Sequence, residues 1–169
     1  MNLDYQSLLP AEFHKSSKVW IYQSSRMLGI GEALEVEDMM EQFVQSWKSH
    51  GTPVKGYANL FFGRFFVLMA DETATGVSGC STDSSVRLIK DIEQRLKIQL
   101  FNREQLAFVV KDKIEYIPLQ QLQYAIDHGF ITAETLYFNN LVSTKEELLE
   151  KWIVPVKESW LAKKLPATI

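Results

Sequence analysis

Apolar residues near the start of the chain follow two different periods, which predict a strand and then a helix. Val19–Tyr22 is a short apolar run, typical of a buried strand. From about Glu32 onward, apolar residues recur at helical spacing while acidic residues fall on the opposite face. We therefore expect an amphipathic helix that ends near His50, with Gly51 as its left-handed cap.

The next stretch predicts a hairpin and, after a polar loop, a second helix. Residues 54–61 and 64–70 are two strand-like runs that meet at Phe62-Gly63, where glycine readily takes the positive φ of a tight turn. The second run is apolar on both faces, which indicates a central strand covered on both sides. A loop rich in Gly, Ser and Thr follows, and an amphipathic helix is expected from about Ser84.

The second half of the chain predicts shorter elements. In order, they are strands at 105–110 and 114–117, a short helix at 118–126, a strand at 135–138 and a helix from Ser143 to about Trp152. Ser143 and Glu146 have the spacing of a capping box, in which a hydroxyl and a carboxylate satisfy each other's neighbouring amides. The stretch after Lys157 holds Trp160 and is otherwise tail-like.

This order of elements indicates an α+β fold with a mainly antiparallel sheet and three or four helices. The first five elements have the order of a ferredoxin-like unit up to its fourth strand. Residues 1–17 are polar and irregular, so we expect an N-terminal arm that packs loosely if at all. Residues 18–169 are then expected to form a single domain.

Composition removes several classes of function. The chain has 169 residues and a net charge of −3, and its basic residues are scattered among acidic ones, so a nucleic-acid partner is not expected. Its single cysteine excludes an internal disulfide, and no Cys/His spacing fits a structural zinc site. No secretion signal and no apolar stretch of the roughly 20 residues needed for a membrane span is present. We therefore expect a cytoplasmic protein.

Several stretches carry a resemblance to a known family. They are Trp20-Ile-Tyr-Gln-Ser-Ser-Arg26, Trp47-Lys-Ser-His-Gly51, Ser78-Gly-Cys-Ser-Thr-Asp-Ser-Ser-Val86, Phe138-Asn-Asn-Leu-Val142 and Trp152 through Pro155 to Trp160. Together they resemble a family of short, uncharacterised bacterial proteins often labelled "ABC transporter ATPase". That label implies a phosphate-binding loop of the form Gly-x-x-x-x-Gly-Lys-Ser/Thr. Here Gly79 is followed by Cys80 and no such loop occurs, so ABC-type ATPase activity is not expected.

The loop between the central strand and the second helix contains the candidate nucleophile, Cys80. A thiolate near the amides of a helix start is stabilised, and His50 could then serve as its base with Asp83 or Asp71 as the orienting carboxylate. The alternative is that Cys80 is a small, inert buried side chain, which is a frequent role of a free cysteine.

The same loop could instead bind an anion through hydroxyls and helix amides. The candidate ligand-binding residues are Arg26, Ser78, Gly79, Ser81, Thr82, Ser84 and Ser85. In this hypothesis Arg26, at the end of the first strand, faces the same end of the sheet as the loop. The alternative is that Asp83 or Ser84 is an ordinary N-cap that satisfies the helix amides itself.

Two further groups of residues have both a functional and a structural interpretation. Asp71 or Glu72 together with Asp83 could hold a divalent cation, but such carboxylates are more often solvated, and we predict no metal site. Trp152 and Trp160 could line a binding surface with Asn139 and Asn140. The alternative, which we favour, is that the C-terminal segment folds back and buries its tryptophans on the sheet.

These observations favour a binding or protein-interaction module with its site near residues 76–85. Its partner would be a small anionic ligand or another protein. The alternative is a cysteine-dependent hydrolase or transferase that uses Cys80. A homodimer is left open, because a hairpin edge or the C-terminal tryptophans could pair.

Overall fold

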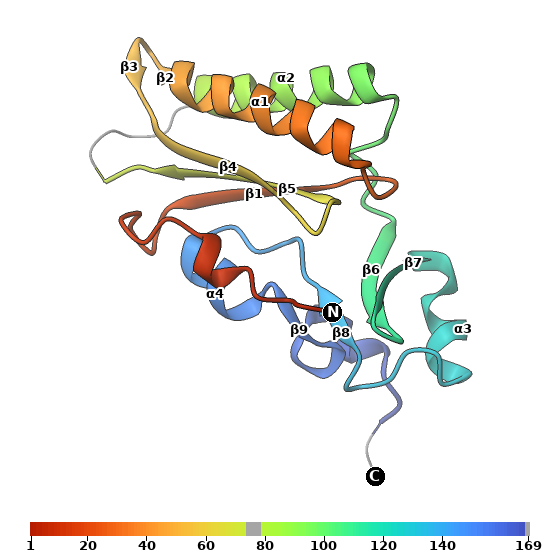
Figure 1. The fold of residues 1–169 in the computed structure, drawn as a ribbon. Helices are drawn as coiled ribbons and strands as arrows, with labels where there is room; N and C mark the ends of the chain where they lie inside the picture. Colours follow the sequence, from red (N-terminus) through yellow and green to blue (C-terminus); the bar gives the residue numbers. More distant parts are fainter. Residues whose placement is uncertain (74–78, 168–169) are drawn as a thin grey trace.

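Three antiparallel strands and two helices form the first half of the protein (Figure 1). The computed structural model describes residues 1–73 and 79–167, with only the backbone of residues 79–81. In the first sheet the strand order is β1 (Lys18–Gln23), β5 (Phe65–Asp71), β4 (Lys55–Phe61). Helices α1 (Ile30–Ser46) and α2 (Gly79–Leu96) cover one face of this sheet. All of β5 is buried, which confirms its predicted central position.

The first sheet has the arrangement expected of a ferredoxin-like unit, but only up to its third strand. Both β1 and β4 pair antiparallel with β5, so they run parallel to each other and are connected through α1. The edge of β1, where a fourth strand would pair, is occupied by a later segment: the Val19 N–H donates to the Ser143 carbonyl at 3.0 Å. The next strand therefore joins a different sheet.

The second sheet has the strand order β7-β6-β8-β9, and every pair in it is antiparallel. Its strands are β6 (Gln105–Val110), β7 (Lys113–Pro118), β8 (Leu136–Phe138) and β9 (Ile153–Pro155). The other elements of this half are α3 (Leu122–Asp127), α4 (Lys145–Lys151) and the short 3-10 helices η2 (Leu119–Gln121), η3 (Val156–Glu158) and η4 (Trp160–Lys164). With the small hairpin of β2 (Lys48–Ser49) and β3 (Thr52–Pro53), the described residues form three antiparallel sheets and four α-helices, which confirms the α+β class.

Predicted element boundaries are wrong at the end of α1, at the N-cap of α4 and at the start of α2, which begins at Gly79 and not near Ser84. Helix α1 ends at Ser46, and His50 and Gly51 form the β2–β3 turn at φ 49° and 80° instead of capping the helix. Trp47, the residue after the helix, has extended backbone angles, and its ring packs on Gly56 of β4, where a Cβ atom would lie 2.5 Å from that ring. The N-cap of α4 is Thr144, which accepts from the Glu147 amide, one residue later than predicted.

The N-terminal arm is irregular apart from the 3-10 helix η1 (Gln6–Leu8), but the expectation that it packs loosely is wrong. Tyr5, Leu9 and Phe13 are buried in the core on the face of the first sheet opposite α1 and α2. The Tyr5 hydroxyl donates to the Leu148 carbonyl at 2.6 Å, and burial raises the pKa of Tyr5 to about 12. The arm is therefore part of the core, because three of its apolar side chains have nowhere else to be buried.

The interpretation favoured on the sequence, that the C-terminal tryptophans are buried on the sheet, holds for Trp152 but not for Trp160. Trp152 is fully buried, and its ring makes edge contacts with Tyr5, Phe61 and Phe65. Trp160 is half-buried beside the second sheet, where it packs near Tyr137. These contacts place aromatic rings between the two sheets and fix how the sheets meet.

Candidate functional site

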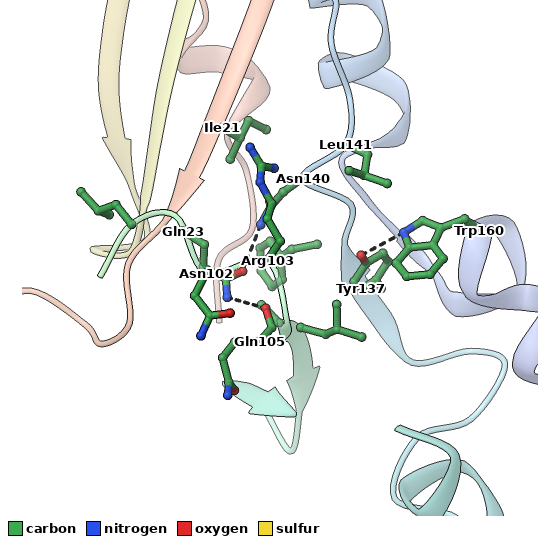
Figure 2. Close-up of a pocket in the computed structure, with 13 residues that line it drawn as sticks. Ile21, Gln23, Asn102, Arg103, Gln105, Tyr137, Asn140, Leu141 and Trp160 are labelled. Atoms are coloured by element: carbon green, nitrogen blue, oxygen red, sulfur yellow. Dashed lines mark hydrogen bonds between the residues drawn. The ribbon is translucent and has the colours of Figure 1, made fainter. Parts of the chain in front are cut away.

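A small cavity lies where the two larger sheets meet (Figure 2). Its volume is about 70 Å³, which is room for a few water molecules or a small organic ligand. The residues that line it are Ile21, Gln23, Leu100, Asn102, Arg103, Gln105, Leu106, Ala107, Tyr137, Phe138, Asn140, Leu141 and Trp160. The floor is apolar, and polar side chains gather on one wall.

Two side-chain amides on one wall of the cavity, Gln23 and Asn140, are hydrogen-bonded to each other and to the Trp152 indole, which lies outside the cavity lining; we call these three groups the amide chain (Figure 2 shows its first two members). The Trp152 indole N–H donates to Asn140 Oδ1 at 2.9 Å, and Asn140 Nδ2 donates to Gln23 Oε1 at 3.0 Å. Gln23 Nε2 in turn donates to the Gln105 carbonyl at 2.9 Å. The amide chain thus connects the residue after α4, the first sheet and the second sheet through partly buried hydrogen bonds.

Among the described residues that line the cavity, Arg103 is the only charged one and none is acidic. It forms no ion pair with any residue that the structure describes. Its guanidinium is close enough to Tyr22 to act on that hydroxyl: burial raises the pKa of Tyr22, and the positive charge of Arg103 lowers it in part. The cavity wall therefore carries a net positive charge with no partner in the described chain.

Neighbouring groups add hydrogen-bond donors and close the far side of the cavity. Asn102 accepts the Glu104 amide on its carbonyl oxygen at 2.9 Å, which leaves its amide N–H groups for other acceptors. On the opposite wall the Trp160 indole N–H donates to the Tyr137 hydroxyl at 3.1 Å. Burial raises the pKa of Tyr137, and the bond from Trp160 lowers it in part, so this hydroxyl stays protonated at neutral pH.

Arg26, predicted to face the Ser/Thr-rich loop, lies at the other end of the sheet. Because β1 and β5 are antiparallel, the end of β1 meets the start of β5, whereas the loop follows the end of β5. Arg26 binds the Glu32 carboxylate through two bonds of 2.8 Å and reaches the Leu96 carbonyl at the end of α2. A ligand could therefore not touch Arg26 and Ser84 together, since about 18 Å of helix separates Ser84 from Leu96.

The described hydroxyls and carboxylate of the predicted anion site belong to the interior of a helix. Helix α2 begins at Gly79, so Asp83 and Ser84 lie beyond its first turn and neither is the N-cap. Ser85 is fully buried, and its hydroxyl donates to the Thr82 carbonyl at 2.6 Å. The backbone amides near Ser84 and Ser85 are thus positioned for helix bonds, which removes that part of the predicted anion cradle.

The remaining predicted residues of this loop fall outside the described part of the chain. Ser78 is not described, and of Gly79, Cys80 and Ser81 only the backbone is. His50 lies exposed in the β2–β3 turn. The predicted pairing of Cys80 with His50 therefore stays a prediction.

Asp71 has a structural role that the sequence did not reveal. It is buried and accepts the His14 and Thr73 amides at 3.0 and 2.9 Å and the Thr73 hydroxyl at 2.7 Å. Burial alone would raise its pKa, but these bonds and the nearby Lys55 charge hold the pKa well below its usual range. Within the described residues no group of three or more His, Cys, Asp or Glu side chains could hold a metal ion.

Sequence reasoning missed Arg103, because it stands in an exposed linker without any motif around it. Asn140 and Trp160 were named as candidates for a binding surface, and both line the cavity. Gln23 could have been found from its position at the end of a buried strand, where an amide needs a partner. None of these signals indicated that the first strand, the linker before β6 and residue 140 would meet.

Comparison with protein-family models finds no match for this chain, and comparisons with curated proteins and with solved structures find none either. The resemblance to the proteins labelled "ABC transporter ATPase" therefore stays an expectation. Among the described helices, none is both long and apolar enough to cross a lipid bilayer.

Proposed function

We propose that this protein binds a small organic carboxylate in the cavity between its two larger sheets. The observation that carries the proposal is Arg103, a cation without an ion-pair partner in the described chain, on a cavity wall without any acidic residue. A guanidinium offers a planar pair of donors that fits a carboxylate. The apolar floor of Ile21 and Phe138 suits a short hydrocarbon tail.

The hydrogen bonds already made in the cavity favour an anion over a cation or a neutral polar ligand. The amide chain uses the acceptor oxygens of Gln23 and Asn140 internally, which leaves few acceptors for a donor-rich ligand. Apart from the Gln105 side-chain amide, which can donate or accept, the lining groups that bind no described residue are donors: the Arg103 guanidinium and the amide N–H groups of Asn102. A carboxylate would satisfy both at once.

The side chains of the cavity favour binding over catalysis. Among the described lining residues there is no Ser, Cys, His, Asp, Glu or Lys, the groups that usually act as nucleophile, acid or base. Tyr137 is the one hydroxyl, and its raised pKa keeps it from acting as a base at neutral pH. We therefore place a binding role ahead of the cysteine-dependent enzyme.

The four tryptophans give this proposal a test with internal controls. Trp160 lines the cavity and Trp152 ends the amide chain, whereas Trp20 and Trp47 pack together beside α1. In a titration followed by NMR of the indole N–H signals, propionate should shift the Trp160 and Trp152 signals at millimolar concentration and leave the other two in place. Propionamide, which has the same shape without the charge, should have little effect.

Arg103→Gln should weaken propionate binding by roughly tenfold or more, since hydrogen bonds to charged groups contribute about 1.5–3 kcal/mol. Arg87→Gln on α2 is the matched control, because it removes an equal charge outside the cavity. Equal binding by Arg103→Gln, or equal shifts with propionamide, would contradict the proposal.

A further inference from the structure

β4 is an edge strand of the first sheet, and part of its outer edge is open. The Leu60 N–H donates to the side chain of Asn59 at 2.8 Å, so the backbone groups of Leu60 point away from β5. Along an antiparallel strand, the backbone N–H and C=O groups of successive residues point alternately toward the partner strand and away from it. The backbone groups of Gly56 and Ala58 therefore point away from β5, as those of Leu60 do. At the start of the strand the Val54 N–H is bound by the Trp47 carbonyl at 2.9 Å. Between these two closed ends, the outward groups of Gly56 and Ala58 bind no residue that the structure describes.

Helix α1 runs beside this open edge and forms the second wall of a groove. The groove has a volume of about 590 Å³ and is lined by Met40, Val44, Glu37 and Glu41 on the helix and by residues 56–59 on the strand. Met40 is buried and Val44 half-buried, so the floor is apolar. An open strand edge beside a helix is a geometry in which proteins take up an extended peptide as an additional strand.

The charges of the groove are all negative. Glu37 and Glu41 are exposed and form no ion pair with a described residue, whereas the neighbouring Glu32 and Glu35 pair with Arg26 and Arg95. Of the residues that the structure describes, no Lys or Arg lines the groove. Two acidic side chains at an open edge are therefore left for a partner with positive charge.

The spacing of the two carboxylates fits an extended chain. Glu37 and Glu41 stand four residues apart on α1, which is about 6 Å along the helix axis. Alternate side chains of a strand are about 6.6 Å apart. Two basic residues with one residue between them, on a strand paired with Gly56 and Ala58, would therefore each have a carboxylate opposite.

We propose that the β4 edge binds an extended segment of another protein that has basic residues at alternating positions. This site lies apart from the cavity, on the α1 side of the first sheet. Backbone bonds from Gly56 and Ala58 supply the pairing, and Glu37 and Glu41 select the partner by charge.

The probe is an acetylated and amidated peptide, Lys-Thr-Lys-Val-Lys-Thr, compared with a peptide of the same composition, Lys-Lys-Thr-Val-Lys-Thr, in which no two lysines are separated by a single residue. The alternating peptide should bind more tightly, and the amide signals of Gly56 and Ala58 should shift in NMR and exchange more slowly with solvent. Binding that leaves these two amides unchanged would overturn the proposal, and so would equal affinity for both peptides.

Two variants test the two parts of the site separately. Glu37→Gln with Glu41→Gln should weaken binding about tenfold, whereas Glu115→Gln with Glu150→Gln, which makes the same change in net charge away from the groove, should not. Ala58→Pro removes an outward N–H and should abolish binding of the peptide. It should leave the β4–β5 hydrogen bonds intact, and an unchanged melting temperature of the variant would verify this. Unchanged affinity in either test variant would overturn the proposal, as would self-association through the same amides in the absence of peptide.

Discussion

The two faces of the first sheet are buried in different ways. α1 and α2 cover one face, and each is joined to the strands on either side of it in the sequence. The opposite face, which we call the arm face, is covered by the N-terminal arm, the end of α4 and residues of the second sheet. Its contacts connect the two ends of the chain: Tyr5 reaches Leu148, 143 positions away.

This difference shows that a segment with little regular secondary structure can cover one face of a sheet as well as helices do. The arm has one short 3-10 helix, yet its side chains are as buried as those of α1. Buried polar contacts take the place of a helix: the Lys145 ammonium donates to the carbonyls of Pro10 and Phe13 at 2.7 and 2.8 Å. We therefore expect the arm face to contribute to stability as much as the helix face.

The largest expected effect is that of Trp152→Ala. This substitution removes a fully buried ring at the centre of the arm face and leaves Asn140 Oδ1 without its indole donor. We expect a loss of about 3–5 kcal/mol in the free energy of unfolding, measured by urea denaturation, in a single transition. Ile92→Ala on the helix face is the comparison and should lose a similar amount. A loss below about 1 kcal/mol for Trp152→Ala would show that the arm face is not part of the cooperative core.

A smaller effect is expected of Asp71→Asn, which weakens the bonds that hold the arm at His14. The pKa of Asp71 is lower in the folded protein than its unfolded value of about 3.9. The charged carboxylate therefore stabilises the folded state fully above about pH 3.9, and this contribution is lost as the pH falls through the folded pKa. We expect a loss of about 1–3 kcal/mol at pH 7 that shrinks below about pH 4. Thermal unfolding across this pH range measures it, with Asp38→Asn on α1 as the control. A loss that does not change with pH would contradict the role of the charge.

The smallest effect is expected on the helix face, from Glu32→Gln. The bond from Arg26, with the Gly29 amide, lowers the pKa of Glu32 to about 2. Its stabilisation is therefore present above the unfolded pKa of about 4.3 and is lost as pH falls toward 2. Because the pair is exposed and screened by water, Glu32→Gln should lower the melting temperature at pH 7 by less than Asp71→Asn does. Glu37→Gln on the same helix has no ion pair to lose and is the control, and an effect of Glu32→Gln larger than that of Asp71→Asn would reverse the comparison.

The comparison also explains which parts of the fold could be predicted. The helix face follows from local patterns: the periodicity of α1 and α2, the apolar run of β5 and the turn at Phe62-Gly63 are all visible within a few residues. The arm face depends on contacts between distant segments. Nothing near Phe13 in the sequence indicates that Lys145 will approach its carbonyl, so the arm was expected to be loose.

The candidate site was harder to predict for the same reason. Sequence reasoning looked for chemistry within one loop, around Cys80, because motifs are local patterns. The cavity instead combines Gln23, Arg103 and Asn140 from three separate segments. Each of these side chains is ordinary in its own surroundings, and only their meeting at the junction of the sheets makes a site.

The arm and its partners are far apart in the sequence, which has a consequence for folding during synthesis on the ribosome. Tyr5 emerges 143 residues before Leu148, which is a delay on the order of ten seconds at usual rates of translation. During that time β1, β4 and β5 can pair and α1 and α2 can dock, while Val19, Val67 and Met69 on the other side of the sheet have only the arm to cover them. A nascent chain at this stage presents an apolar surface to chaperones, and the arrival of α4 and Trp152 removes it.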